Sequence, residues 1–290
     1  MKDLIQEIPE KVIHETLKGI VIPSAPQLIV DLQLEMASSH VQLDKIAEII
    51  VKDVGISGKV IKLINSPFFG LRSHIVSIQH AISLLGVENI LNIVNSIALQ
   101  QSFSNNNLVN MTRFWDNASD VAMTSAFISR LMGIACPDEA YLLGLFHNSG
   151  IALLIEKFPR YVDILKLAYS EKSTRITDIE NHKIKCNHAV AGYYVAKSWK
   201  LPQYICDAIA DHHKTQAIFT NEIVCETDKK NLLAILKLAE TICKTYKTFG
   251  AEPTDYEFET IKEDLLSYLG ISAYEFDELK ADVFDKCISA

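Results

Sequence analysis

The stretch that decides the fold class is Leu43-Asp44-Lys45-Ile46-Ala47-Glu48-Ile49-Ile50-Val51. Its apolar residues recur at positions i, i+3, i+4 and i+7, which places them on one face of a helix. The same period runs through almost every other segment, and no two alternating runs are joined by a hairpin turn. The sequence therefore predicts an all-α protein, a bundle of more than a dozen helices.

Prolines and glycines indicate where these helices begin and end. Helix starts are predicted at Ser24 with Pro26, at Pro137-Asp138-Glu139, at Pro202 and at Pro253. Helix ends are predicted at Gly70, Gly86, Gly133 and Gly250. A long helix is expected from Met111 to Met132, whereas the polar segment from Thr215 to Lys230 predicts a surface loop.

The turn-rich cluster Ser104-Asn105-Asn106-Asn107 is the best candidate for a boundary. It separates shorter N-terminal helices from a second part that opens with the long helix. We therefore expect three parts: a smaller N-terminal helical part over 1–107, a larger helical part over 108–250, and acidic C-terminal helices over 251–290.

The negative charge is concentrated at one end of the chain. The 290 residues carry a net charge of -8, and the segment from Gly250 to Ala290 holds 11 acidic and 3 basic residues, which accounts for all of it. A neutral body without a basic surface disfavours nucleic acid as a partner. Apolar residues at helical spacing in the tail predict two amphipathic helices: Leu265, Leu266, Leu269, Phe276, Leu279, Val283 and Phe284. Their acidic face is expected to be solvated; the alternative is that it docks a basic partner.

Nothing in the sequence indicates secretion or a membrane. The six cysteines are scattered without a Cys-x-x-Cys pair, and the charged start lacks the apolar run of a signal peptide. The uncharged stretch from Asn89 to Thr112 contains too many amide side chains to span a bilayer. We expect a cytoplasmic protein with no membrane partner. The oligomeric state cannot be predicted.

Histidines after residue 140 form the candidate site. His147 lies in Gly144-Leu145-Phe146-His147-Asn148-Ser149-Gly150, His188 opens an apolar helical stretch, and His212 and His213 follow Ile209-Ala210-Asp211. Helices of a bundle can bring such imidazoles together around a metal ion. The alternative is that each histidine caps a helix or is simply hydrogen-bonded, and spacing does not decide between the two.

The segment Gly144 to Asn148, with Leu201-Pro202 and the His212-His213 pair, resembles the HD superfamily of metal-dependent phosphohydrolases. More narrowly, the chain resembles the HDOD (HD-related output domain) family over about residues 20 to 245. That resemblance rests on segments in the expected order: Ile22 to Pro26, Ile46 to Asp53, Lys62 to Gly70, Ile78 to Gly86, Phe114-Trp115, Gly144 to Gly150, His188 to Gly192 and Trp199 to Pro202. It implies a bacterial protein with an HD-like C-terminal helical domain after a smaller N-terminal subdomain.

The same resemblance implies a degenerate metal site. Asn117 stands where the first histidine of the HD cage would fall, and Asn148 replaces the aspartate of the His-Asp pair. Ile151 replaces the lysine that often follows, and Glu240 matches the final aspartate. An amide offers a dipole where a carboxylate offers a full charge, so a two-metal hydrolytic centre loses its bridging ligand. The remaining metal candidates are His147, His188, His212, His213 and Glu240.

From this resemblance we expect a non-catalytic module of signal transduction that contacts signalling proteins or a small ligand and acts as a stand-alone adaptor. No catalytic or cofactor-binding residue is assigned, and no cofactor is required. The alternative is a phosphohydrolase with an altered, histidine-rich ligand set in which His188 and His212 replace the lost ligands around a divalent metal. In the absence of a metal, Asn117 and Asn148 are expected to hydrogen-bond one another or His147.

Overall fold

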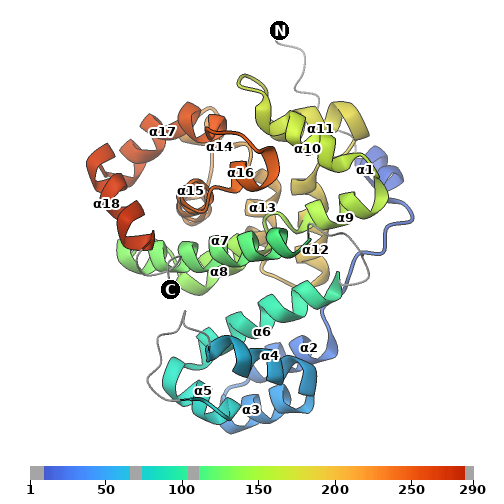
Figure 1. Ribbon diagram of the computed structural model, residues 1–290, viewed down its shortest axis with the longest axis vertical. Coiled ribbons are helices and arrows are strands. Elements are labelled where there is room, and N and C mark those ends of the chain that lie inside the picture. The colour runs from blue at the N-terminus through green and yellow to red at the C-terminus, as the bar shows by residue number, and fades with distance from the viewer. Residues whose placement is uncertain (1–9, 66–73, 104–110, 285–290) are drawn as a thin grey trace. The chain divides into compact units, whose positions relative to one another are not determined.

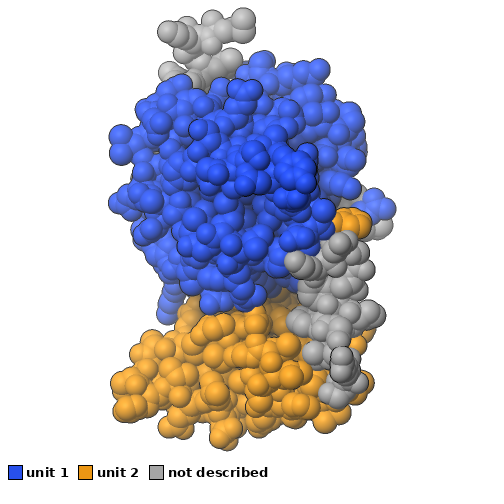
Figure 2. All heavy atoms as spheres, turned by 90° about the vertical axis from the view of Figure 1, so that its left-hand side faces the viewer, with its two compact units in different colours: residues 1–22, 108–283 blue, residues 23–107, 284–290 orange. Residues whose placement is uncertain are grey.

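The computed structural model describes residues 10–65, 74–103 and 111–284. Throughout these ranges every regular element is a helix (Figure 1), which confirms the predicted all-α class. The chain forms two compact units (Figure 2): of the described residues, unit 2 contains 23–103 and unit 1 contains 10–22 and 111–283. The described residues 251–283 belong to unit 1.

Unit 2 is built from five helices of the described chain. They are α2 (Gln27–Met36), α3 (Leu43–Lys52), α4 (Val54–Ile64), α5 (Ile78–Leu85) and α6 (Val87–Ser102). The apolar face of α3 packs into the core of this unit, since Ile46, Ala47 and Ile50 are fully buried. Asn65 ends α4, where its amide donates to the carbonyl of Ile61 and pairs with the backbone of Ile75 through two hydrogen bonds.

Unit 1 carries the remaining described helices. They are α1 (Glu10–Leu17), α7 (Met111–Met132), α8 (Pro137–Phe146), α9 (Ser149–Lys157), α10 (Tyr161–Ser170), α11 (Ile176–Ile184), α12 (His188–Ser198), α13 (Gln203–Asp211), α14 (Thr215–Phe219), α15 (Thr227–Ile242), α16 (Thr245–Gly250), α17 (Tyr256–Leu269) and α18 (Ala273–Val283). The long α7 has the predicted bounds, and Pro137 opens α8 as expected. Trp199 and Trp115 lie in the core of this unit.

Two glycines let helices of unit 1 approach closely enough to form the site. A Cβ at Gly150 of α9 would lie 2.0 Å from the carbonyl oxygen of His188 and 2.5 Å from the nitrogen of Gly192, both in α12. A Cβ at Gly144 of α8 would lie 2.7 Å from the Cα of Ala122 in α7. No side chain fits at either place, so glycine is required there for packing and not for backbone torsion.

Several predicted helix limits are corrected. Pro26 itself is the N-cap of α2 and no side chain caps that end, so Ser24 is not its cap. Gly250 is the last residue of α16, and Ala251 adopts the left-handed conformation that ends it. The expected loop from Thr215 to Lys230 contains α14 and the start of α15. Gly70 lies outside the described residues.

The two acidic C-terminal helices form as predicted. Their apolar residues pack inward, with Leu265, Phe276 and Val283 almost fully buried, but Phe284 is exposed. The Asp255 carboxylate caps α17 by accepting a hydrogen bond from the Phe258 N–H. Among the helices described, none is both long and apolar enough to cross a membrane.

Candidate functional site

Four of the predicted histidines meet inside unit 1. His147 follows the last residue of α8, His188 is the first residue of α12, and His212 and His213 follow the end of α13. The first three are fully buried and His213 is 2% exposed. Helix termini place them because α9 and α12 touch at Gly150, which brings the start of α12 beside the end of α8.

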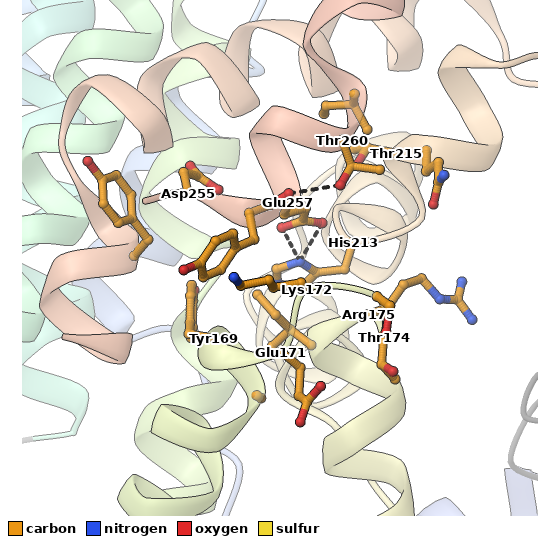
Figure 3. Close-up of a pocket in the computed structure, with 17 residues that line it drawn as sticks. Tyr169, Glu171, Lys172, Thr174, Arg175, His213, Thr215, Asp255, Glu257 and Thr260 are labelled. Atoms are coloured by element: carbon orange, nitrogen blue, oxygen red, sulfur yellow. Dashed lines mark hydrogen bonds and ion pairs between the residues drawn. The ribbon is translucent and has the colours of Figure 1, made fainter. Parts of the chain in front are cut away.

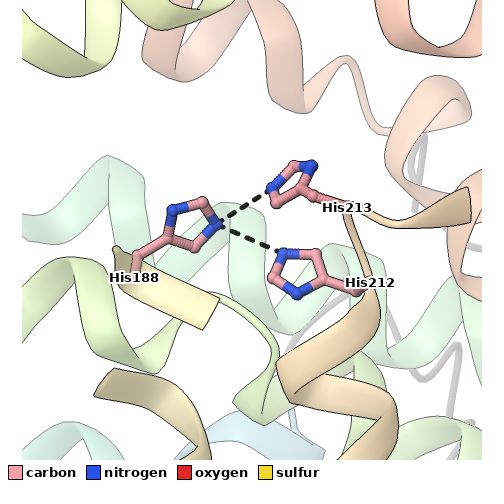
Figure 4. A group of neighbouring side chains, drawn as sticks. All are labelled: His188, His212 and His213. Atoms are coloured by element: carbon pink, nitrogen blue, oxygen red, sulfur yellow. Dashed lines mark hydrogen bonds between the residues drawn. The ribbon is translucent and has the colours of Figure 1, made fainter. Parts of the chain in front are cut away.

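Three of the rings approach one another through their Nε2 atoms (Figure 4). The Nε2 of His188 lies 3.2 Å from the Nε2 of His212 and 3.0 Å from the Nε2 of His213. One ligand nitrogen from each ring lies within 4.8 Å of the other two. Nitrogens bound tetrahedrally to one zinc ion, each at about 2.0–2.1 Å, lie about 3.3 Å apart. The observed separations are close to that value.

The opposite nitrogen of every ring is held by an oxygen acceptor. The Nδ1 of His147 lies 2.7 Å from the carbonyl oxygen of Gly144, and that of His212 lies 2.7 Å from the carbonyl oxygen of Ile209. The Nδ1 atoms of His188 and His213 lie 2.8 Å from the carboxylates of Glu180 and Glu257, respectively. An oxygen acceptor requires an N–H donor, so His188, His212 and His213 carry a proton on Nδ1 and, when neutral, present a lone pair on Nε2.

This arrangement is the one that metal-binding histidines adopt. Such histidines donate their second ring N–H to a carboxylate or a carbonyl, which fixes the tautomer and turns the lone pair toward the ion. The Nε2 atoms of His212 and His213 lie 3.2 and 3.0 Å from that of His188; if all three carry lone pairs they repel one another, and a cation between them removes this repulsion. Burial lowers the pKa values of His212 and His213, as do the neighbouring histidines and, for His213, Lys237. Neutral rings at both positions fit a metal ion.

Charged groups line the other side of the cluster. The Oε1 of Glu240 lies 3.3 Å from the Nε2 of His147, and the ammonium of Lys237 lies 2.8 Å from Glu240 and 3.1 Å from Glu257. Burial alone would raise the pKa of Glu240, but Lys237 and His147 outweigh it and hold that pKa well below its ordinary value. Burial would likewise lower the pKa of Lys237, and the two carboxylates raise it instead. Both groups are therefore charged at neutral pH.

The two asparagines differ in what they contact. Asn117 donates to the carbonyl oxygen of Cys243 and accepts from the hydroxyl of Thr245, so it ties α7 to the end of α15. Asn148 is buried, and neither atom of its amide has a hydrogen-bond partner among the residues that the structure describes. The expectation that they bond one another or His147 is wrong, because the chain after α15 takes up Asn117. A buried amide without a hydrogen-bond partner is costly, so the amide beside His147 favours a polar group or an ion at this place.

The sequence matches the HDOD domain family model over residues 22–215. This chain belongs to the HDOD family. The resemblance read from its motifs is confirmed, although the matched range ends at residue 215 and not near 245. Glu240, the last candidate ligand, lies beyond that range. So does Glu257, whose carboxylate contacts the Nδ1 of His213.

This HDOD protein is similar to several known proteins at low sequence identity. An uncharacterized protein of Treponema pallidum (strain Nichols) is 23% identical over 193 residues, which is 66% of this chain and 37% of that protein. A Shewanella amazonensis structure, named as a candidate phosphohydrolase, has a TM-score of 0.71 at 18% identity and covers 96% of this chain and 95% of that one. A candidate signal transduction protein of Marinobacter aquaeolei has a TM-score of 0.66 at 16% identity, with 96% and 64% coverage. At these identities the structures share the fold.

Three residues of the site were not singled out from the sequence: Glu180, Lys237 and Glu257. Glu180 is fully buried, and it accepts from Nδ1 of His188 and from the hydroxyl of Tyr161. Lys237 lies one helical turn before Glu240 within an apolar stretch, which is a signal that could have been used. Glu257 carried no signal, because it is one of many acids in the C-terminal segment.

Proposed function

We propose that this HDOD protein is a non-catalytic module of signal transduction whose histidine cluster holds a single divalent metal ion. The observation that carries the proposal is the common orientation of the rings. Every Nδ1 faces an oxygen acceptor, and the Nε2 of His188 lies within 3.2 Å of the Nε2 atoms of His212 and His213. His188, His212 and His213 would be the ligands, with Glu180, Glu257 and the Ile209 carbonyl orienting them.

The metal class follows from the ligands. Three buried imidazoles suit Zn²⁺, Ni²⁺, Co²⁺, Cu²⁺ or Fe²⁺, whereas Mg²⁺ and Ca²⁺ prefer oxygen ligands. A bound ion would supply a positive charge that joins the start of α12 to the end of α13. It would therefore stabilise the centre of unit 1.

Two features favour a structural or regulatory role over hydrolysis. Asn148 offers no charge where a bridging carboxylate would stand, and the charge of Glu240 is neutralised by Lys237. The rings of His147, His188 and His212 are also fully buried, which leaves only His213, at the wall of a neighbouring cavity, within reach of a substrate. Both features support a site that binds without turning over a substrate.

The metal is tested by its stoichiometry and its ligands. Protein prepared without chelator is expected to contain about one transition-metal ion per chain by mass spectrometry, and stripped protein is expected to bind Zn²⁺ at the same ratio in calorimetry. His188→Ala is expected to weaken Zn²⁺ binding at least about a hundredfold because one of three ligands is lost. Glu180→Gln, which removes only the charge behind His188, is expected to cost about tenfold to a hundredfold.

The matched control is His182→Ala, which removes an exposed histidine of α11 that has no place in the cluster. It is expected to bind Zn²⁺ like the unaltered chain. Far-UV circular dichroism verifies that each variant is folded. Zn²⁺ affinity that is equal in His188→Ala, Glu180→Gln and the control would refute the metal site.

A turnover assay separates the proposal from the alternative predicted from the sequence, a phosphohydrolase with an altered ligand set. With Mn²⁺, Fe²⁺ or Ni²⁺ added, we expect hydrolysis of a generic phosphodiester no faster than that of the His147→Ala variant. Turnover that His147→Ala abolishes would show that the protein is an enzyme. That result would leave the metal site standing and overturn only the non-catalytic role.

The signalling role is supported by family membership and by the Marinobacter relative named as a candidate signal transduction protein. We propose that the partners are signalling proteins. Affinity capture from the source cells, quantified against an unrelated helical protein of similar charge, is expected to enrich regulators of signal transduction. Enrichment of metabolic enzymes alone would contradict this role.

A further inference from the structure

A cavity of about 320 Å³ lies beside the histidine cluster in unit 1 (Figure 3). Its walls come from the segment between α10 and α11, from the start of α14 and from α16 and α17. His213 and Glu257 line it, and the hydrogen bonds between them are drawn in Figure 3. Tyr246, Tyr256 and Thr260 also line it, and all three lie beyond the residues that the family model matches.

Two buried hydroxyls of the lining lack partners in the part of the chain that the structure describes. The Oγ1 of Thr215 and the Oη of Tyr169 make no hydrogen bond, although Thr215 is fully buried and Tyr169 is only 9% exposed. A buried hydroxyl without a partner is costly, and both residues line the cavity. Both can donate to an oxygen.

The positive groups around the cavity are not fully compensated. Lys172 stands over the ring of Tyr256 at 5.0 Å from its centroid, and among the described residues its ammonium has no carboxylate partner. The helices α11 and α17 both begin at the cavity, at Ile176 and Tyr256. Their first N–H groups lack intrahelical acceptors and carry partial positive charge.

The acidic side chains of the lining are mostly engaged elsewhere. Glu257 is paired with Lys237 and with His213. Asp255 accepts hydrogen bonds from the Phe258 N–H and the Thr241 hydroxyl. Arg175, the second cation, is paired with Asp178. Glu171 is exposed to solvent. Among the described residues of the lining, the uncommitted groups are therefore the ammonium of Lys172, the hydroxyls of Tyr169 and Thr215, and the solvent-exposed carboxylate of Glu171.

We propose that this cavity binds a small organic anion through its phosphate or carboxylate group. Lys172 would pair with the anion, the hydroxyls of Tyr169 and Thr215 would donate to it, and the rings of Tyr246 and Tyr256 would contact its apolar part. Because Glu257 lines the cavity and also holds His213, an occupant reaches the histidine cluster through one side chain. In that respect the inference rests on the proposed function, since it gives the module an input; binding itself does not depend on a metal.

Calorimetry and thermal shift on the full chain test the proposal with four probes: inorganic phosphate, AMP, succinate and, as the uncharged match of AMP, adenosine. At least one of the three anions is expected to bind and to raise the melting temperature at millimolar concentration, and adenosine is not. AMP and succinate distinguish a phosphate from a carboxylate. Lys172→Gln is expected to weaken that binding about tenfold because a charge-assisted contact is lost.

Three variants separate the ligand contact from a general effect on folding. Thr215→Val and Tyr169→Phe are expected to weaken the anion severalfold, without lowering the melting temperature of the free protein, since neither hydroxyl has a partner to lose. Lys166→Gln, an exposed lysine of α10 outside the cavity, is expected to bind like the unaltered chain. Either of two results overturns the pocket: none of the anions binds, or Lys172→Gln binds as tightly as Lys166→Gln. The same titrations on stripped and Zn²⁺-loaded protein keep failure of the pocket distinct from failure of the metal site.

Discussion

At the scale of single residues, the site depends on which carboxylates are paired with Lys237. Lys237 is buried between Glu240 and Glu257, and Glu257 in turn holds the Nδ1 of His213. Burial would raise the pKa of Glu240, but Lys237 keeps that pKa low; at the partly exposed Glu257 burial outweighs Lys237, and the pKa is raised. In place of the aspartate that a hydrolytic cage would use, Asn148 brings no charge to the remaining ligands.

We predict that Lys237→Met destabilises the protein by about 3–5 kcal/mol at pH 7, because the buried Glu240 loses its counter-charge and the partly exposed Glu257 loses a partner. Lys237 lowers the pKa of Glu240 in the folded state, and this contributes stability above the unfolded pKa of about 4.5 that is lost as pH falls toward the folded value. In the Lys237→Met variant, burial raises the pKa of Glu240 above its unfolded value, so the stability of the variant falls as pH rises. The deficit relative to the unaltered chain is therefore expected to be larger at pH 7 than at pH 4 in urea unfolding.

The matched control for this prediction is Lys166→Met, an exposed lysine of α10 that is expected to change stability little. Adding Glu240→Gln to Lys237→Met removes one of the two uncompensated charges, so we expect part of the lost stability to return at pH 7. Equal deficits at pH 4 and pH 7 would mean that Lys237 acts by packing alone.

At the scale of elements, the contact between α9 and α12 positions the histidines. Gly150 faces the carbonyl of His188 so closely that even a methyl group has no room. The helix that carries Asn148 at its start and the helix that begins with His188 are held together at this point. The geometry of the cluster therefore depends on a residue that has no functional group.

We predict that Gly150→Ala destabilises unit 1 by more than about 2 kcal/mol and weakens Zn²⁺ binding, because α12 must move away with His188. Gly58→Ala in α4 is the matched control: a Cβ there meets nothing, and alanine is the better helix former. It is expected to be neutral or stabilising by up to about 1 kcal/mol. Chemical denaturation with Zn²⁺ calorimetry measures both effects, and equal results for the two glycines would show that the crossing does not position His188.

At the scale of the whole molecule, the chain forms two compact units (Figure 2). The histidine cluster and the cavity both lie in unit 1. Both tryptophans of the chain, Trp115 and Trp199, are also in unit 1. Tryptophan fluorescence therefore reports on the unit that carries the candidate sites, whereas far-UV circular dichroism reports on the helices of both units.

We predict that saturating Zn²⁺ shifts unfolding of unit 1 and leaves that of unit 2 unchanged. An ion at a hundred times its dissociation constant adds about 2.7 kcal/mol to the state that binds it. In urea, the midpoint measured by fluorescence is expected to rise, while the circular dichroism curve shifts only in part. Coincident shifts of both signals would indicate that the chain unfolds as one cooperative body.

Much of this fold is local, and for that reason the sequence alone predicts it. Hydrophobic period and capping residues predict helices such as Met111–Met132 and the start at Pro137, because a helix satisfies its own backbone within a few residues. Short or polar helices are not predicted from the sequence. The five-residue α14 lies in a segment whose composition predicts a loop, since a helix this short forms through the burial of Ile218 and Phe219 in the folded unit.

The sequence by itself determined the fold class, the family and four histidines with Glu240 as the only metal candidates. Only the tertiary structure decided how these residues are used, because ring orientation depends on groups distant in sequence. His213 meets Glu257 across 44 residues, Asn117 meets Thr245 across 128, and the cavity forms from helices that no motif links. The tautomer of a histidine is set by whatever faces its second nitrogen, and that is a property of packing, not of spacing along the chain.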